Sequence, residues 1–293
     1  MSKPQVLLTG ANGFLGSYLL EALIKQGYAV IVLKRSMSNL WRIEHLAGQY
    51  KSYDVDTQPI EQAFKDQPID CLIHTACHYG RNGDSIANIV ESNLMYGLKL
   101  LEAAIAHNVS TFINTDSLLP RDLNAYSLSK KQLVEWLKLQ SDKIQVINLK
   151  LEHMYGPKDD ATKFVSWILS QLEHNVPEIK LTQGEQQRDF IYIEDIVSAY
   201  LTVIEKAPVL AQYNEFDVGT GELITVKSFL EQLKATYEDF FGVTETKLAF
   251  GAVPYREGEM MQVSLDNKEL CNLGWQPKTD LPTGLKKTLK DNQ

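Results

Sequence analysis

Residues 5–36 read QVLLTGANGFLGSYLLEALIKQGYAVIVLKRS. This stretch begins with an apolar run, turns through Gly10, Gly13 and Gly16, continues with helical spacing of apolar residues, and ends with a second apolar run at 30–33. Short apolar runs are typical of strands that are buried on both faces. The pattern therefore predicts a strand, a tight turn, a helix and a strand, which form one crossover unit of a doubly wound parallel sheet.

The glycine turn has the features of a phosphate-binding loop. Glycines let the backbone pass close to a pyrophosphate, and the first residues of the following helix offer free N–H groups and a partial positive charge. The position of the turn between two strand-like runs favours dinucleotide binding over an ordinary glycine-rich turn. The candidate contacts are Gly10, Asn12, Gly13, Phe14, Leu15 and Gly16.

The second strand ends in Lys34, Arg35 and Ser36. Dinucleotide folds that select NAD usually carry an acid at this point to bind the ribose hydroxyls, and no acid is close to these residues in the sequence. Two cations and a hydroxyl suit a 2′-phosphate, so we expect NADP(H) as the cofactor. The alternative is a solvated basic turn that binds nothing.

The composition limits the class of protein. The chain has 293 residues, of which 44% are hydrophobic and 23% charged, as is ordinary for a globular protein with one large domain or two lobes. A net charge of −8 argues against a nucleic-acid surface, and no stretch has the pattern of a secretory signal or a membrane span. Cys71, Cys77 and Cys271 lack metal-type spacing. We therefore expect a cytoplasmic protein with reduced thiols and no metal site.

Strands and helices continue to alternate up to about residue 151. Further strands are expected at 50–56, 69–77, 109–117 and 144–151, and helices at 60–67, 85–107 and 126–140. Beyond Pro157 the alternation loosens. We expect a dinucleotide-binding domain formed by 1–150 plus about 188–218, and a smaller α/β substrate lobe formed by 151–187 plus 219–293.

Tyr126 and Lys130 carry the candidate chemistry. They are four residues apart on an expected helix, so they share one face. A nearby ammonium group stabilises a phenolate, so we expect the pKa of Tyr126 to fall and the residue to exchange a proton with a carbonyl or an alcohol. Thr115 or Ser117, at the end of the fifth strand, offers a hydroxyl for the same oxygen. A YxxxK pattern is common by chance, and its place after that strand is what favours catalysis.

Several motifs resemble one known family. TGANGFLG (9–16), YSLSK (126–130), LKLEHMYGP (149–157) and QRDFIYIED (187–195) are similar to motifs of the extended short-chain dehydrogenase/reductase family of nucleotide-sugar epimerases, dehydratases and reductases. ACHYGR (76–81), NTDS (114–117), REGEMM (256–261) and LGWQP (273–277) resemble the branch of 4-ketoreductases that make CDP-abequose and CDP-paratose. The resemblance covers essentially the whole chain. It implies a Rossmann fold and NADPH-dependent reduction of the C4 ketone of CDP-4-keto-3,6-dideoxyglucose, for the dideoxyhexoses of lipopolysaccharide O-antigen.

The resemblance also implies the catalytic roles. Tyr126 matches the proton donor, Lys130 matches the lysine that holds the cofactor ribose, and Thr115 matches the catalytic hydroxyl. Ser117 is the second candidate for that hydroxyl and stands where the dehydratases have an acid. The loop between Thr115 and Tyr126 is shorter than is usual in the family, which leaves the choice between the two hydroxyls open.

The cofactor contacts beyond the glycine turn follow from the same comparison of motifs. They are Lys34, Arg35, Ser36, Asp54, Val55, Thr75, Ala76, Cys77 and Asn93, together with Tyr126 and Lys130. From the residues alone, Asp54 is interpreted as a surface acid. Asn93 is interpreted as a buried asparagine that hydrogen-bonds to nearby backbone.

The substrate contacts implied by the resemblance lie in the second half of the chain. They are Glu152, His153, Lys163, Phe164, Arg188 and Arg256. The two arginines are expected to bind the diphosphate, because guanidinium geometry suits phosphate oxygens. Glu152 and His153 replace a Phe-Asn pair of the wider family and are expected at the sugar, with a structural hydrogen-bonding role for His153 as an equal alternative.

Three functions fit these residues. The first is an NADPH-dependent nucleotide-sugar 4-ketoreductase. The second is an epimerase with permanently bound NAD, which uses the same residues without net oxidation or reduction. The third is a non-catalytic NAD(P)-binding sensor, which the intact Tyr126, Lys130 and Thr115 disfavour. The helices at 85–107 and 126–140 have apolar residues on more than one face, and the resemblance implies that they pair in a homodimer.

Overall fold

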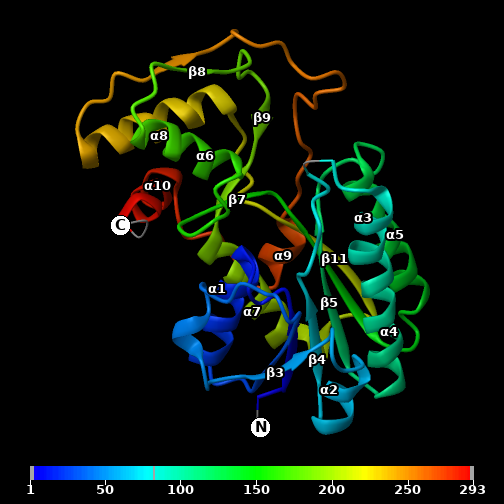
Figure 1. Ribbon diagram of the computed structural model, residues 1–293. Coiled ribbons are helices and arrows are strands. Elements are labelled where there is room, and N and C mark those ends of the chain that lie inside the picture. Colours follow the sequence, from blue (N-terminus) through cyan, green and yellow to red (C-terminus); the bar gives the residue numbers. More distant parts are fainter. Residues whose placement is uncertain (1–2, 82, 291–293) are drawn as a thin grey trace. The chain divides into compact units, whose positions relative to one another are not determined.

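Seven parallel strands form the main sheet of the computed structural model, which describes residues 3–81 and 83–290 (Figure 1). The strands are β1 (Val6–Thr9), β2 (Val30–Lys34), β3 (Lys51–Asp54), β4 (Cys71–His74), β5 (Thr111–Ser117), β6 (Gln145–Leu151) and β11 (Tyr213–Val218). Their order across the sheet is β11-β6-β5-β4-β1-β2-β3, and every neighbouring pair is parallel. The doubly wound sheet predicted from the sequence is confirmed.

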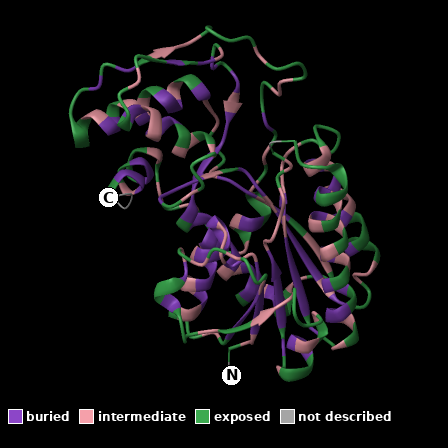
Figure 2. Ribbon diagram, viewed as in Figure 1, coloured by how far each residue is buried: buried purple, intermediate pink, exposed green. Residues whose placement is uncertain are grey.

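Helices cover this sheet on both faces (Figure 1). They are α1 (Phe14–Lys25), α2 (Glu61–Asp66), α3 (Ile86–Val90), α4 (Tyr96–Ala106), α5 (Ala125–Leu139) and α7 (Ile193–Lys206), with short 3₁₀ turns at Glu44–Leu46 and Ala207–Val209. Apolar residues of α2, α4 and α5 form one buried cluster with Leu7, Leu72 and Phe112 of the strands. Figure 2 shows the central strands buried and the helices exposed on their outer sides, whereas the edge strand β3 is at most partly buried. The cover on both faces explains why β1, β2 and β4 are mainly apolar in the sequence.

The single helix expected at 85–107 is interrupted. α3 ends at Val90, and Glu91–Met95 forms a π-helical turn before α4 begins at Tyr96. Turns of this kind are rare and frequently lie at functional sites. Apolar periodicity does not reveal the turn, because the residues on both sides of it keep nearly helical spacing.

The second compact unit contains short strand pairs and helices. β7 (His153–Tyr155) pairs with β10 (Phe190–Tyr192), β9 (Gln187–Arg188) with β12 (Ile224–Thr225), and β8 (Glu178–Lys180) with β13 (Lys247–Ala249). Its helices include α6 (Phe164–Glu173), α8 (Val226–Phe241) and α10 (Leu281–Lys290). The core is aromatic, since the rings of Phe190 and Phe229 stack with centroids 3.7 Å apart and Tyr155 packs edge-on against Phe229.

The backbone alternates between the two units. The first unit comprises the residues up to Leu151, Val197–Val218 and Glu269–Trp275. It therefore contains most of α9 (Lys268–Asn272). The second unit comprises Glu152–Ile196, Gly219–Lys268 and the residues from Gln276 onward. The first boundary between the units lies after residue 151, one residue from the predicted boundary. Residues 188–196, which were expected in the first unit, belong to the second, and residues 269–275, which were expected in the second, belong to the first. The assignment of cofactor to the first unit and of substrate to the second stays a prediction. Within the described ranges, no helix combines the length and the apolar character needed to cross a membrane.

Candidate active site

The site of the first unit lies where its strand order changes direction. From β1 the strands run outward to β2 and β3 on one side and to β4, β5 and β6 on the other. Doubly wound sheets bind ligands beyond the carboxyl ends of the strands at such a point. The turn after β1 and the segment after β4 are therefore the expected position of a dinucleotide.

The glycine turn has a geometry that only glycine allows. Gly10 has a φ of 71°, and a Cβ on it would lie 2.7 Å from the amide nitrogen of Ala76. A Cβ on Gly16 would clash with the carbonyl oxygen of Gly10, so α1 approaches the turn closely only because residue 16 is glycine. Gly13 is the N-cap residue of α1 and has no side chain to cap the first N–H groups of the helix. These features fit the pyrophosphate of a dinucleotide.

Hydrogen bonds fasten the segment after β4 to β1. The hydroxyl of Thr75 donates to the carbonyl of Thr9 (2.7 Å), and the amide of Ala76 donates to the hydroxyl of Thr9 (3.3 Å). That hydroxyl also lies 2.8 Å from Nδ1 of His74, whose pKa burial lowers to about 3, so the ring is neutral. The structure therefore brings two predicted cofactor contacts, Thr75 and Ala76, next to Gly10.

The ends of β2 and β3 bring together cations and acids that are far apart in the sequence. Lys34 pairs with Asp54 in the strand register, and Ser36 donates from its hydroxyl to Asp54 (2.7 Å) and from its amide to Asp56 (2.8 Å). The hydrogen bond from Ser36 lowers the pKa of Asp54, which is a carboxylate at neutral pH. Two acids therefore lie beside the residues predicted to bind a 2′-phosphate. Arg35 is exposed at the same strand end.

The loop after β2 is held against the glycine turn. Asn12 donates from its side chain to the carbonyl of Asn39, and its own carbonyl accepts from Arg42, both at 3.3 Å. Val55, another predicted contact, packs against the core and donates from its amide to the carbonyl of Lys34 (2.9 Å). Arg42 is a cation beside the turn that the sequence analysis did not single out.

Asn93 lies in the π-helical turn and is fully buried. Its Oδ1 accepts from the amide of His78 (2.6 Å), and its Nδ2 donates to the carbonyl of His78 (2.9 Å) and to the hydroxyl of Ser129 (3.1 Å). The predicted hydrogen bonding to backbone is confirmed, and a contact with the cofactor stays a prediction. Because Ser129 belongs to α5, Asn93 ties the segment after β4 to the helix that carries Tyr126.

Tyr126 and Lys130 lie in the first two turns of α5, where Tyr126 is half-buried and Lys130 is buried. Lys130 is 1% exposed, and burial lowers its pKa. Burial also raises the pKa of Tyr126 well above its usual value, and Cys77 and Asp116 add to this effect. The expected fall in the pKa of Tyr126 is therefore wrong, because the loss of water around the phenol raises this pKa. A tyrosine that stays protonated is suited to donate a proton.

Tyr79 covers one side of Tyr126. The two rings stack with centroids 5.1 Å apart and planes 27° apart. Tyr79 follows β4, is 38% exposed, and has the guanidinium of Arg81 5.5 Å from its ring centroid. Only the resemblance of the ACHYGR motif drew attention to this segment, since no spacing rule connects it with α5.

Thr115 and Ser117 are two residues apart in β5, so they point to the same face of the sheet. Oγ1 of Thr115 lies 2.6 Å from the hydroxyl of Tyr200 in α7. The hydroxyl of Ser117 is buried and has no hydrogen-bond partner among the described residues. Sequence reasoning missed Tyr200, which is 85 residues from Thr115.

The opposite face of β5 carries a buried ion pair. The side chain of Asp116 is 1% exposed, and its Oδ2 lies 2.7 Å from Nζ of Lys131. Asn148 donates to the same oxygen (3.3 Å), and Asn114 donates to Asn148 (2.8 Å). This polar chain fastens α5 to β5 and β6, and so fixes the helix of the candidate acid against the strand of the candidate hydroxyl.

Glu152 and His153 form a pair at the start of the second unit. Nδ1 of His153 lies 2.7 Å from Oε2 of Glu152, whose side chain is 3% exposed, whereas that of His153 is 41% exposed. The imidazole ring also packs against Phe190 with centroids 5.8 Å apart. The hydrogen-bonding role of His153 is confirmed, and a contact of either residue with a sugar stays a prediction.

The two predicted diphosphate-binding arginines differ in their surroundings. Arg188 is buried in β9 and donates to the carboxylate of Glu259 (2.7 Å) and to the carbonyl of Gln187 (2.8 Å). These bonds use two of its five N–H donors. Arg256 is exposed. The other predicted substrate contacts begin α6, with Lys163 as the N-cap residue and Phe164 as the first helical residue. For all four, substrate binding stays a prediction.

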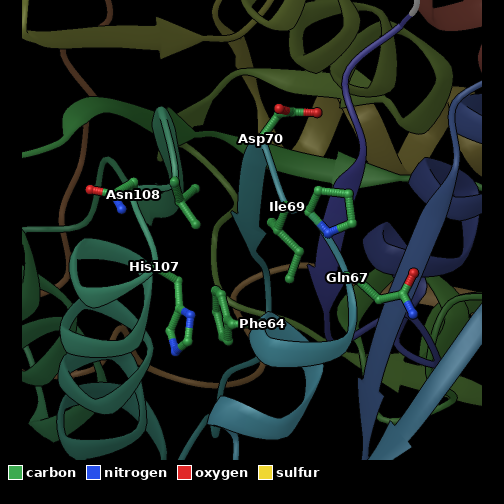
Figure 3. Close-up of a pocket in the computed structure, with 8 residues that line it drawn as sticks. Phe64, Gln67, Ile69, Asp70, His107 and Asn108 are labelled. Carbon is green, nitrogen blue, oxygen red and sulfur yellow. The ribbon is translucent and has the colours of Figure 1, made fainter.

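A pocket of about 220 Å³ lies at the opposite end of the same sheet (Figure 3). It is lined by Phe64, Gln67, Pro68, Ile69, Asp70, His107, Asn108 and Val109. The rings of Phe64 and His107 stack with centroids 5.7 Å apart. These segments precede β4 and β5, at the amino ends of the strands, and contain none of the residues predicted from the sequence. The carboxyl ends are where doubly wound sheets bind their ligands, so the pocket is not the candidate active site.

Residues 6–219, which contain the glycine turn and the Tyr126–Lys130 pair, match the family described as the NAD dependent epimerase/dehydratase family. The match covers most of the chain, and the chain belongs to this family of pyridine-nucleotide-dependent enzymes. The resemblance noted from the motifs is thereby confirmed.

Individual relatives narrow the comparison. The chain is 34% identical to the CDP-abequose synthase of Salmonella typhimurium over 98% of both chains. It is 25% identical to a putative UDP-glucose 4-epimerase of Methanocaldococcus jannaschii over 97% of both. Among solved structures, the UDP-glucose 4-epimerase of Thermotoga maritima with UDP-glucose has a TM-score of 0.84 at 23% identity, with 98% of each chain covered, which shows a shared fold.

Proposed function

We propose that the protein is an NADPH-dependent reductase of the C4 ketone of a nucleotide-activated 4-keto-6-deoxy or 4-keto-3,6-dideoxy sugar, with CDP-4-keto-3,6-dideoxyglucose as the favoured substrate. The observation that carries the proposal is the position of Tyr126 in the first turn of α5, stacked on Tyr79 and one turn before the buried Lys130, beside a sheet of the dinucleotide-binding type. The similarity to CDP-abequose synthase over the whole chain supports the substrate class. Synthesis of deoxysugars for a lipopolysaccharide O-antigen is the corresponding biological role.

Reduction of a ketone needs a hydride at carbon and a proton at oxygen. The reduced nicotinamide supplies the hydride when bound. Tyr126 gives its phenolic proton to the ketone oxygen as the double bond becomes single, and Thr115 donates a hydrogen bond to the same oxygen. Lys130 binds the cofactor ribose, and its cation stabilises the phenolate that Tyr126 becomes. The raised pKa of Tyr126 supports this direction, because the acid must be protonated beforehand.

The nucleotide sugar is assigned to the second unit. Arg188 and Arg256 are proposed to bind its diphosphate. The bond to Glu259 supports this role for Arg188, because it holds a long side chain in one orientation before a ligand arrives. Glu152 and His153 are proposed to contact the hydroxyls of the sugar, with the ring of His153 oriented by the buried carboxylate.

Selectivity for NADPH is proposed from the cations at the end of β2. A 2′-phosphate suits the exposed Arg35, and Nζ of Lys34 lies 3.8 Å from Asp54, so it partly offsets the charge of that acid. Asp54 and Asp56 act in the opposite sense, since carboxylates repel a phosphate and accept from ribose hydroxyls. Substitution of Arg35 tests whether the cations outweigh the two acids in the choice of cofactor.

Arg35→Ala is expected to raise the KM for NADPH about tenfold, the value of one charge-assisted hydrogen bond, and to leave the KM for NADH nearly unchanged. The physical reason is that only NADPH carries the phosphate that the guanidinium contacts. Initial rates with each cofactor at saturating sugar nucleotide measure the effect, with NADH as the internal control. An equal loss for both cofactors would contradict the 2′-phosphate contact.

Epimerisation with permanently bound NAD is the second candidate function. It is favoured by Asp54 and Asp56, which lie where NAD-selecting folds carry an acid. An epimerase uses Tyr126 to move a proton in both directions without net change in the cofactor. Its marker is NAD that stays with the protein through purification.

Cofactor oxidation separates the two functions. Purified protein is mixed with CDP-4-keto-3,6-dideoxyglucose, generated in place by upstream enzymes, and the loss of NADPH and of NADH is followed separately. Oxidation that is selective for NADPH supports the reductase, and the C4 configuration of the product then names the sugar. No oxidation, together with bound NAD, supports the epimerase, which is then tested on unreduced sugar nucleotides.

A homodimer is proposed through the helices α3 and α5. Apolar side chains are exposed on them, among them Ile86 (70%), Trp136 (48%) and Leu139 (66%). We expect light scattering at micromolar concentration to give the mass of two chains, and Trp136→Glu to shift it toward one, because a buried charge disfavours the interface. A monomeric wild-type protein would contradict the proposal.

A further inference from the structure

The hydroxyl of Thr115 is held by a tyrosine of α7. Tyr200 lies in α7, is 0% exposed, and has its hydroxyl 2.6 Å from Oγ1 of Thr115. We propose that Tyr200 is a positioning residue, which fixes the hydroxyl of Thr115 as a hydrogen-bond donor toward the ketone oxygen of the substrate. The inference rests on the proposed function, because it concerns the same reacting oxygen.

The direction of this hydrogen bond follows from burial. Burial raises the pKa of Tyr200, so its hydroxyl carries one proton that needs an acceptor. Within the described ranges, 3–81 and 83–290, that hydroxyl has no hydrogen-bond partner other than Thr115. If Thr115 donated the bond, the phenolic proton would be left buried without an acceptor, which is costly. Tyr200 is therefore the donor and Thr115 the acceptor.

This direction has a consequence for Thr115. A threonine hydroxyl has one proton and two lone pairs, and it rotates to suit its surroundings. Because Tyr200 occupies a lone pair, the proton of Thr115 is directed away from Tyr200. Thr115 is only partly buried, so that proton can reach a ligand. A donor that is already oriented is what a ketone oxygen needs as negative charge develops on it.

The same argument distinguishes Thr115 from Ser117. Both point to one face of β5, but the hydroxyl of Ser117 has no partner in the described part of the chain. Only the hydroxyl of Thr115 is oriented by the protein. The structure therefore favours Thr115 as the hydroxyl that assists Tyr126, a choice that the sequence left open.

A double-mutant cycle tests the proposal. Tyr200→Phe removes only the hydroxyl from a fully buried ring, and we expect it to lower kcat about tenfold, with the KM for the sugar nucleotide and the affinity for NADPH unchanged. Thr115→Val is expected to lower kcat more strongly. In the Thr115→Val background Tyr200→Phe should cost nothing further, whereas in the Thr115→Ser background, which keeps a hydroxyl, it should again cost about tenfold.

The outcomes are separable. Tyr155→Phe, which removes a hydroxyl from another buried tyrosine, is the matched control and should leave kcat unchanged. Full activity of Tyr200→Phe, or an equal loss with and without Thr115→Val, would overturn the positioning role. A wild-type protein that oxidises no NADPH instead counts against the proposed reductase. In that case the thermal unfolding midpoints of the wild type, Tyr200→Phe, Thr115→Val and the double variant test the hydrogen bond without any substrate. Additive effects of the two substitutions on the midpoint would overturn the inference.

Discussion

Tyr126→Phe is expected to lower kcat for ketone reduction by about 10²–10⁴-fold, the usual contribution of a general acid. Phenylalanine keeps the ring that stacks on Tyr79, so the substitution removes only the O–H group. Because the proposed cofactor contacts at Gly10, Gly13 and Gly16 are untouched, the affinity for NADPH should stay within about twofold. Cofactor oxidation measures the first effect, and a fluorescence titration with NADPH measures the second.

The pH dependence provides an independent check on Tyr126. Its pKa is raised, so its acid form persists through the neutral range and is lost only at strongly alkaline pH. Reduction, which needs the acid form, should therefore not decline between about pH 6 and pH 9 through this group, whereas the reverse oxidation, which needs the phenolate, should become faster as the pH rises. Tyr155→Phe should leave both profiles unchanged. A Tyr126→Phe variant that keeps more than about a tenth of the wild-type kcat would show that another group is the acid.

The fold could be predicted because its signals are local. The glycine turn and the apolar runs each lie within a few residues, and the constraint on Gly16 comes from Gly10, only six residues earlier. The Tyr126–Lys130 pair was recognisable for the same reason, since one helix turn brings the two residues onto one face. Signals of this kind need no knowledge of which strands are neighbours.

The errors concern groups that only the folded chain brings together. Asp54 and Asp56 are 18 and 20 residues from Ser36 and meet it because β3 lies beside β2. The sequence near Arg35 could not show that these two acids lie beside it. The raised pKa of Tyr126 depends on how many atoms exclude water from its phenol, which a YxxxK spacing does not encode.

The contact of Tyr200 with Thr115 is another contact that forms only when the chain folds. It joins α7 to β5 across 85 residues of sequence, and a tyrosine in an amphipathic helix is ordinarily read as core. The sequence could supply both hydroxyl candidates, Thr115 and Ser117, but not the neighbour that distinguishes them. Sequence reasoning thus proposes the residue types of the candidate site, while burial and long-range contacts decide which protonation state and which hydrogen-bond donor each residue provides.

Lys131→Met is expected to destabilise the protein by about 3–5 kcal/mol, because it leaves the buried carboxylate of Asp116 without its cation. Methionine keeps the length of the side chain but removes the ammonium group, and with it the ion pair and a hydrogen bond to the carbonyl of Ser117 (2.6 Å). The one other bond to Oδ2 of Asp116 among the described residues comes from Asn148 at 3.3 Å, which is too long to compensate. Lys25→Met is the matched control: its ion pair with Glu21 has the same 2.7 Å separation but is exposed, so the expected cost is about 0–1 kcal/mol.

A second substitution identifies the cause of this deficit. Adding Asp116→Asn to Lys131→Met should restore part of the loss, since the amide buries no charge. Thermal unfolding of the wild type and of the two variants measures this, with a deficit of several degrees for Lys131→Met that shrinks in the double variant. A deficit that Asp116→Asn does not relieve would mean that Lys131 stabilises α5 through packing of its stem and its hydrogen bond to the carbonyl of Ser117 (2.6 Å), and not through the charge of Asp116.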